Sequence, residues 1–179
     1  IKPRKALNKA FLKVKPYRED IEVFKKNLIK ILDFADDSES EEYHKNLVSG
    51  FLKDSLYHNN YFINTSGRSD QVIHVGPKPD SKVGVIIEAK NANNKSEMVS
   101  TDNLNKKAFH ELLLYFLRER ITKGNLEVKN LIITNLFEWF IFDANSFEKG
   151  FVANKTFVKK FKDFESGNLS GTNTDFFYN

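Results

Sequence analysis

The first part of the chain contains two stretches whose apolar residues recur at steps of three and four, a spacing that predicts helices. The first stretch runs from Tyr17 to Ala35 and ends at two aspartates and a serine. The second runs from about Glu39 to Tyr57. Its start matches a capping box, with Ser38 as the N-cap and Glu41 three residues later.

After these helices the pattern changes to that of strands. Two short β-prone runs, Tyr61–Thr65 and Asp70–Val75, are separated by a turn that contains glycine. The next run, Val83–Glu88, is apolar almost throughout and carries a charge only at its end. Such a run predicts a central strand that is buried on both faces of a sheet.

The rest of the chain is expected to form a helix, two strands and a final helix. Thr101 or Asp102 caps the first of these helices, and Gly124 suits its C-terminal end. The later segments are strands over 128–134 and 138–142 and a helix marked by Phe157, Phe161 and Phe164. The predicted order, ααβββαββα, indicates an α/β domain with a mixed central sheet of about five strands flanked by helices.

Composition narrows the class of protein. A chain of 179 residues fits one domain, expected over residues 1–165, and the Gly-, Ser- and Asn-rich stretch 166–179 is expected to be a linker toward a missing downstream region. The absence of cysteine excludes disulfides and cysteine-based zinc sites and fits a reducing compartment. No apolar run approaches the roughly 20 residues of a membrane-spanning helix, so no membrane partner is expected. The net charge of +4 is compatible with a polyanionic partner but is weak support for one.

Charged residues at the end of the predicted central strand point to chemistry. Glu88 and Lys90 are two positions apart, so their side chains project to the same side of the strand. Asp70 opens the preceding strand. If these strands pair as an antiparallel hairpin, the start of one lies beside the end of the other, and Asp70 faces Glu88. Two carboxylates and one lysine then converge at one edge of the sheet.

Two neighbouring carboxylates repel each other unless a positive charge lies between them. Oxygen ligands suit Mg²⁺, for which Mn²⁺ can substitute, so the predicted metal ligands are Asp70, Glu88 and the carbonyl of Ala89. Lys90 would position or deprotonate a water, or hold the charge that develops on a phosphate. The alternative is a surface ion pair between Glu88 and Lys90, with Asp70 as a turn residue and no function.

These residues resemble the PD-(D/E)XK nuclease superfamily, and most closely the N-terminal nuclease domains of Type IIG restriction-modification enzymes; Type I restriction subunits are a more distant likeness. The resemblance rests on Asp70, on Glu88-Ala89-Lys90 at the end of an apolar strand, and on the order of helices and strands over residues 40–147. No proline precedes Asp70, which departs from the motif in the family's name. The resemblance implies a restriction-endonuclease-like core and a Mg²⁺-dependent, site-specific endonuclease that hydrolyses phosphodiester bonds of double-stranded DNA.

The resemblance also implies roles for residues outside the two strands. Family members often add a glutamate from the helix before the first strand as a further metal or water ligand. Glu42 is preferred here because Glu41 is assigned to the capping box, and the choice between them stays open. Arg68, Asn91 and Lys95 lie close in sequence to the predicted site and are candidates for contacts with DNA phosphates.

Other residues receive structural interpretations. Glu111 and Tyr115 stand four residues apart on a predicted helix, where related nucleases carry a Gln and a Tyr near the metal. A helix-surface charge and a core aromatic explain them equally well. Trp139 is expected to pack against the sheet, and the four histidines have no metal-binding spacing.

The same resemblance implies the partners. The methyltransferase and target-recognition regions are expected in the same full-length chain, in the cytoplasm of a prokaryote, and a transient dimer would cut both DNA strands. The alternative function is a catalytically inactive nucleic-acid-binding or docking module with the same fold. If the domain is a nuclease, Lys90→Ala is expected to abolish cleavage and to leave the fold and DNA binding nearly unchanged.

Overall fold

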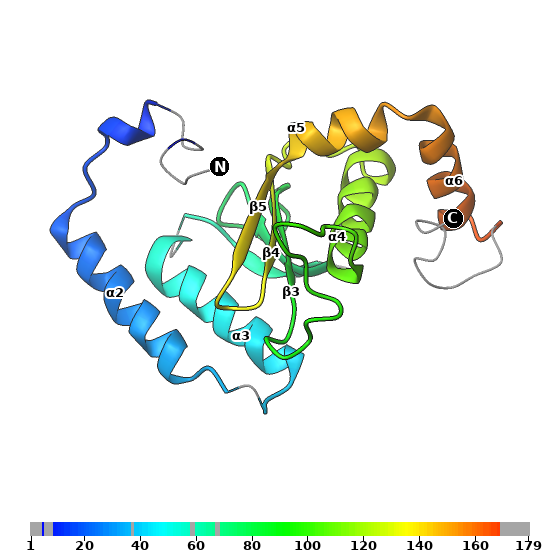
Figure 1. The fold of residues 1–179 in the computed structure, drawn as a ribbon. Coiled ribbons are helices and arrows are strands. Elements are labelled where there is room, and N and C mark those ends of the chain that lie inside the picture. Colours follow the sequence, from blue (N-terminus) through cyan, green and yellow to red (C-terminus); the bar gives the residue numbers. More distant parts are fainter. Residues whose placement is uncertain (1–4, 6–8, 37, 58–59, 67–68, 169–179) are drawn as a thin grey trace.

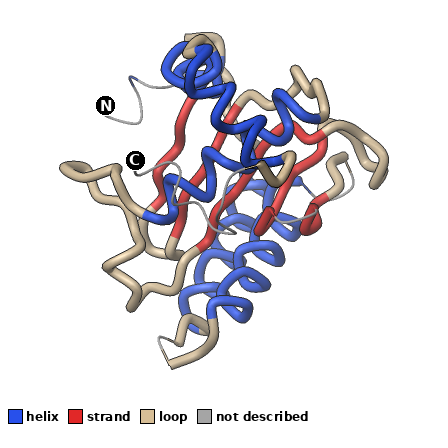
Figure 2. Tube along the Cα trace, turned by 90° about the vertical axis from the view of Figure 1, so that its right-hand side faces the viewer, coloured by secondary structure: helices blue, strands red, loops and turns tan. Residues whose placement is uncertain are grey.

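The computed structural model describes residues 5, 9–36, 38–57, 60–66 and 69–168 (Figure 1). In this part of the chain, a sheet lies between two groups of helices, which Figure 2 shows from a perpendicular direction. The fold is therefore α/β with helices on both faces of the sheet, as the sequence predicts.

Five strands form one mixed sheet. They are β1 (Ile63–Ser66), β2 (Ser69–His74), β3 (Val83–Ala89), β4 (Asn130–Thr134) and β5 (Trp139–Asp143), and they lie in the order β1-β2-β3-β4-β5. The first three pair as an antiparallel meander, β3 and β4 are parallel, and β4 and β5 are antiparallel. The helical crossover between β3 and β4 is needed because parallel neighbours cannot be joined by a tight turn.

Helices occupy the positions that the apolar spacing predicts. They are α2 (Arg18–Asp33), α3 (Glu41–Leu52), α4 (Lys107–Leu117), α5 (Ala144–Phe147) and α6 (Lys155–Glu165). Among the described residues, α5, a helix of four residues, is the α-helix that the predicted order lacks. Further helical turns of three to five residues lie at Phe11–Lys13, Lys53–Tyr57, Arg118–Thr122 and Glu148–Val152. Among the described residues, no helix combines the length and the apolar character needed to cross a membrane.

Each face of the sheet has its own apolar core. On one face, α4, α5 and α6 cover a cluster that includes Val72, Ile86, Leu112, Phe116, Leu131, Phe147 and Phe161. On the other face, α2 and α3 cover a cluster that includes Ile31, Val48, Leu52, Ile63, Ile73 and Ile87. Consecutive residues of β3 thus enter opposite cores, because side chains alternate along a strand. The prediction that β3 is buried on both faces is confirmed.

Trp139 at the start of β5 packs against the core beside α2 and α3, and its Nε1–H donates to the carbonyl oxygen of Leu136 at 3.0 Å. Tyr115 of α4 packs against the opposite core. The packing of Trp139 is thus as the sequence predicts, and Tyr115, for which the sequence allows two roles, is a core aromatic.

Two predicted helix starts are wrong. The N-cap of α3 is Ser40, whose hydroxyl accepts a hydrogen bond from the backbone N–H of Tyr43 at 3.1 Å. Ser38 does not cap it, because its hydroxyl donates to Asp36 Oδ1 at 2.7 Å in the preceding turn. The N-cap of α4 is Lys106, not Thr101 or Asp102.

The end of the α4 segment is predicted correctly. Gly124 has a φ angle of 64°, in the left-handed region that glycine adopts without a steric cost. It follows the helical turn that continues α4. A glycine at this position lets the chain leave the helix and enter the loop before β4.

Candidate active site

Lys90 lies directly after the last residue of β3. Its backbone N–H donates to the carbonyl oxygen of Thr134 at 2.9 Å, which extends the pairing with β4 one residue beyond the strand. The Lys90 side chain is only 4% exposed. A buried lysine must be paired to stay charged, so the groups around its ammonium nitrogen decide what the site can do.

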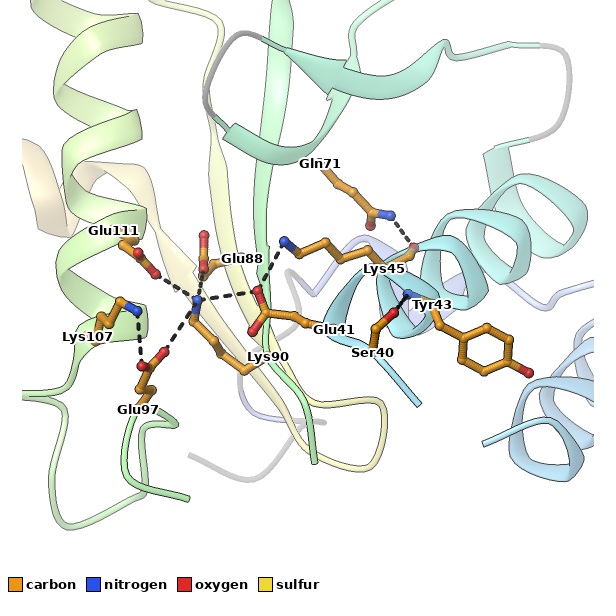
Figure 3. A network of polar contacts seen from close by, with 10 residues as sticks. All are labelled: Ser40, Glu41, Tyr43, Lys45, Gln71, Glu88, Lys90, Glu97, Lys107 and Glu111. Carbon is orange, nitrogen blue, oxygen red and sulfur yellow. Dashed lines mark hydrogen bonds and ion pairs between the residues drawn. The ribbon is translucent and has the colours of Figure 1, made fainter. Parts of the chain in front are cut away.

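Carboxylates surround that nitrogen, as Figure 3 shows. Lys90 Nζ lies 2.6 Å from Glu88 Oε1 and 2.7 Å from Glu111 Oε2. Two more carboxylates lie farther away, at 3.8 Å for Glu41 Oε1 and 3.9 Å for Glu97 Oε2. The two short contacts are charge-assisted hydrogen bonds, and the two long ones are ion pairs without a direct hydrogen bond.

The four carboxylates come from four different parts of the fold. Glu88 is two residues before Lys90 on β3, and Glu111 lies on α4. Glu41 is the first residue of α3, and Glu97 lies in the loop between β3 and α4. The site therefore forms where the end of the central strand meets helices from both faces of the sheet (Figure 3).

Two further lysines border this group. Lys45 Nζ lies 3.1 Å from Glu41 Oε1, one helical turn along α3. Lys107 Nζ, at the start of α4, lies 3.0 Å from Glu97 Oε1. The seven side chains carry four carboxylates and three ammonium groups, so they have an excess of one negative charge.

The electrostatics keep Lys90 charged. Burial lowers the pKa of Lys90, but the negative charge of Glu88 and the hydrogen bonds to Glu111 and Glu88 outweigh burial, so the pKa lies above its ordinary value. At the border, the hydrogen bond to Glu97 raises the pKa of Lys107. In this arrangement Lys90 is an ammonium ion at neutral pH and acts as a hydrogen-bond donor, not as a base.

The alternative of a surface ion pair does not fit this geometry. Glu88 is 1% exposed and belongs to the interior together with Lys90. A pair at the surface contributes little and needs no further partners. A buried pair costs desolvation energy, which is recovered only if the remaining donors and acceptors are also satisfied.

The backbone of Asp70 belongs to β2, but its side chain lies outside the described residues. β2 and β3 pair as the predicted antiparallel hairpin, with Gln71 opposite Ile87 and Val72 opposite Ile86. Continued by one residue, this register puts the Asp70 backbone opposite Glu88.

Glu41, and not Glu42, is the helix-borne acid beside Lys90. Glu42 is exposed, whereas Glu41 Oε1 approaches both Lys90 and Lys45. The sequence argument preferred Glu42 because it assigned Glu41 to a capping box. Because α3 begins two residues later than that box requires, Glu41 is available for the site.

The candidates for DNA contacts have different positions. Asn91 follows Lys90 and its Nδ2 donates to the carbonyl oxygen of Glu39 at 2.8 Å, which ties this loop to the start of α3. Lys95 is exposed in the same loop. Arg68 lies outside the described residues.

Of the carboxylates at Lys90, the sequence leaves the role of Glu111 open between a helix-surface charge and a place near the metal, and it does not point to Glu97. For Glu111 a signal was present, since it lies three residues after Ala108 and four before Tyr115, within the apolar face of α4. A charged residue on such a face needs a buried partner. For Glu97 no such signal exists, because it lies in a loop without periodicity.

A family model described as a domain of unknown function (DUF7149) matches residues 1–179. The chain belongs to the DUF7149 family. No curated protein and no solved structure matches it. The family description states no activity, so the function of this DUF7149 domain has to be argued from its site.

The donor atoms of this DUF7149 domain are compatible with a hard cation. Among the described residues, no group of three or more His, Cys, Asp and Glu is arranged to hold a metal ion. The four carboxylates of the site share the Lys90 ammonium group as their cation. All of the side-chain acceptors around it are carboxylate oxygens, the ligand type of Mg²⁺ and Mn²⁺. Histidine and cysteine, which zinc prefers, do not contribute to this group.

Proposed function

We propose that this chain is a Mg²⁺-dependent endonuclease domain of the PD-(D/E)XK type, with a restriction-endonuclease-like core, that hydrolyses phosphodiester bonds of double-stranded DNA. The observation that carries the proposal is the buried ammonium group of Lys90, hydrogen-bonded to Glu88 and Glu111 at the end of the central strand. The register of β2 on β3 supports it, because Gln71 lies opposite Ile87, and one further residue along each strand would bring Asp70 opposite Glu88. A hairpin of this kind brings the two acids and the lysine of the motif to one edge of the sheet.

The residues that would hold Mg²⁺ are Asp70, Glu88 and the carbonyl of Ala89. Glu41 is the helix-borne acid in this proposal, since it is the one that approaches Lys90. When bound, the ion supplies Lewis-acid chemistry to the phosphodiester and to the water that attacks it. The excess negative charge of the described side chains favours binding of a cation at this place.

Lys90 stabilises charge in this mechanism. Its pKa is raised by Glu88 and Glu111, so it can donate a hydrogen bond to a phosphate oxygen as negative charge develops there. The sequence alone allowed a second role, the removal of a proton from water. That role requires a neutral amine, which the surrounding carboxylates disfavour.

Glu111 is a positioning residue. Its Oε2 accepts a hydrogen bond from Lys90 Nζ at 2.7 Å, on the side of the ammonium group that faces α4. Glu88 holds the same group from β3. Two fixed acceptors leave the third N–H of the ammonium group for a substrate oxygen, and this orientation costs no reorganisation during the reaction.

The wider context of the proposal is a restriction-modification enzyme. In such an enzyme, the methyltransferase and target-recognition regions belong to the same full-length chain as the nuclease domain. Two nuclease domains then meet transiently to cut both DNA strands. The protein would then act in the cytoplasm of a prokaryote.

Plasmid nicking tests the proposal. The full natural protein is incubated with supercoiled DNA and Mg²⁺ or Mn²⁺, beside the variants Asp70→Asn and Glu88→Gln. We expect the wild type to nick DNA and each variant to lose at least about 100-fold in rate, as for loss of a metal ligand. The control is Glu165→Gln, because Glu165 is also paired with a cation, Arg118, but at the far end of α4. A wild type that binds DNA and never nicks it would establish the inactive binding module instead.

A further inference from the structure

Charged side chains form a continuous row across the candidate site. Lys45, Glu41, Lys90, Glu97 and Lys107 follow one another in space, from α3 across the end of β3 to the start of α4 (Figure 3). One oxygen of Glu41 contacts both Lys45 and Lys90, at 3.1 and 3.8 Å. The two oxygens of Glu97 contact Lys90 and Lys107, at 3.9 and 3.0 Å. Each outer lysine is thus joined to the central one by a single glutamate.

The central and outer lysines differ in their exposure to solvent. Lys90 is buried and has two short hydrogen bonds. The side chains of Lys45 and Lys107 are 15% and 47% exposed, and Glu41 and Glu97 are partly exposed as well. Ion pairs that water reaches stabilise a fold only slightly, so exchanging the glutamate for an external anion costs little.

We propose that Lys45 and Lys107 bind the backbone phosphates on either side of the phosphate that lies at Lys90, so that the nucleic-acid strand runs along this row from α3 to α4. The inference rests on the proposed function and adds the path of the substrate. The order of charges supports it, because the ammonium groups of Lys45 and Lys107 flank a centre that carries the excess negative charge. The negative charges of a nucleic-acid strand repeat at a regular spacing, so the two outer phosphates would meet Lys45 and Lys107, while the phosphate between them would need the Mg²⁺ of the proposed function beside Lys90.

The positions of Lys45 and Lys107 in the fold also fit this role. Lys45 lies on α3 and Lys107 begins α4, so both stand on regular helices rather than on the loop that carries Lys95. Groups on helices keep their positions more precisely than groups on loops. Phosphate contacts of this kind fix the register of a duplex without selecting its sequence.

Binding to DNA, measured apart from cleavage, tests the inference. A fluorescein-labelled duplex is titrated with the full natural protein in Ca²⁺, and the change in anisotropy gives Kd at several salt concentrations. The variants are Lys45→Gln and Lys107→Gln. The matched controls are Lys25→Gln and Lys123→Gln, because each of these lysines also pairs with a glutamate but lies away from the row. Mn²⁺ binding to each protein is measured separately by calorimetry.

We expect Lys45→Gln and Lys107→Gln each to raise Kd by about tenfold, as for loss of one charge-assisted contact. Each should also reduce the slope of log K against log salt by about one, while Mn²⁺ binding is not weakened, because the loss of a positive charge favours a bound cation. The controls should change neither quantity. Variants that bind the duplex as well as the wild type would overturn the inference. So would a wild type that does not bind DNA, or one from which polyglutamate displaces the labelled duplex as well as unlabelled duplex does.

The outcomes for the two proposals are separable. If the wild type nicks DNA but Lys45 and Lys107 do not affect binding, the nuclease proposal stands and the phosphate path is wrong. If binding depends on both lysines and no DNA is ever nicked, the phosphate path stands and the nuclease proposal is wrong.

Discussion

The ammonium nitrogen of Lys90 lies 2.6 Å from Glu88 Oε1, and both side chains are almost completely buried. They stand two residues apart at the end of β3, so the alternation of the strand puts them side by side. Each group neutralises the charge of the other in a position with little exposure to solvent. The pair is therefore a condition for folding as well as a candidate for chemistry.

The first prediction concerns stability. Lys90→Met leaves the Glu88 carboxylate buried without its short cation contact, and loss of one member of a buried pair costs about 3–5 kcal/mol. We expect a decrease of this size in the free energy of unfolding, measured by urea denaturation. The sequence alone predicts that a substitution of Lys90 leaves the fold nearly unchanged, and the burial of the pair argues against that prediction.

Two further variants make this prediction specific. The double variant Lys90→Met/Glu88→Gln removes both buried charges and should recover part of the stability, because Glu111, which also loses its contact with Lys90, is partly exposed and can be hydrated. Lys25→Met removes a lysine from an exposed pair with Glu22 and should change the free energy by less than about 0.5 kcal/mol. Equal effects of Lys25→Met and Lys90→Met would contradict the argument.

The second prediction distinguishes two neighbouring acids. Glu41→Gln removes the carboxylate that approaches Lys90 and Lys45, and we expect it to lower the DNA nicking rate by about 10–100-fold. Glu42→Gln is the matched control, since both residues lie in the first turn of α3 and interact similarly with the helix dipole. Initial rates at saturating Mg²⁺ provide the comparison. A larger effect of Glu42→Gln would restore the sequence-based choice.

The third prediction concerns the start of α3. Ser40→Ala removes the side-chain acceptor of the Tyr43 N–H and should lower the free energy of unfolding by about 1 kcal/mol. Ser38→Ala removes only an exposed contact to Asp36 and should have a smaller effect. Thermal unfolding of both variants gives the comparison. If Ser38→Ala were the more destabilising change, the capping box of the sequence argument would be correct.

The fourth prediction is a pH dependence. Burial lowers the pKa of His110, and the nearby charge of Glu111 raises it less, so the pKa of the folded form lies below its ordinary value of 6.5. Below pH 6.5 the unfolded chain binds a proton that the folded chain does not, so folding is disfavoured as the pH falls toward the folded pKa. Above pH 6.5 both forms are neutral and the full stability is present.

His110→Gln should remove this contribution. The free energy of unfolding of the wild type relative to the variant is measured by urea denaturation from about pH 8 to about pH 5. We expect the free energy of unfolding of the wild type, relative to that of the variant, to decrease as the pH falls. The reason is that only the wild type loses stability to protonation of His110. A constant difference across this range would show that His110 titrates alike in both states.

Much of this fold follows from local patterns in the sequence. The apolar run Val83–Ile87 indicates a strand with two buried faces, and the apolar spacing of α2 and α4 indicates helices. The position of Glu88 beside Lys90 also follows from sequence, because a strand repeats every two residues. These features depend on the geometry of one element at a time, and the sequence therefore determines them by itself.

Only the tertiary structure decided which groups surround Lys90. Glu41, Glu97 and Glu111 come from a helix start, a loop and a second helix, and their distances to Lys90 depend on how these segments pack on the two faces of the sheet. The same holds for the cap of α3, where Ser38 and Ser40 are equally good candidates until the turn at Asp36 engages Ser38. A repeating backbone transmits local spacing along one element, whereas contacts between distant segments result from the packing of the whole domain.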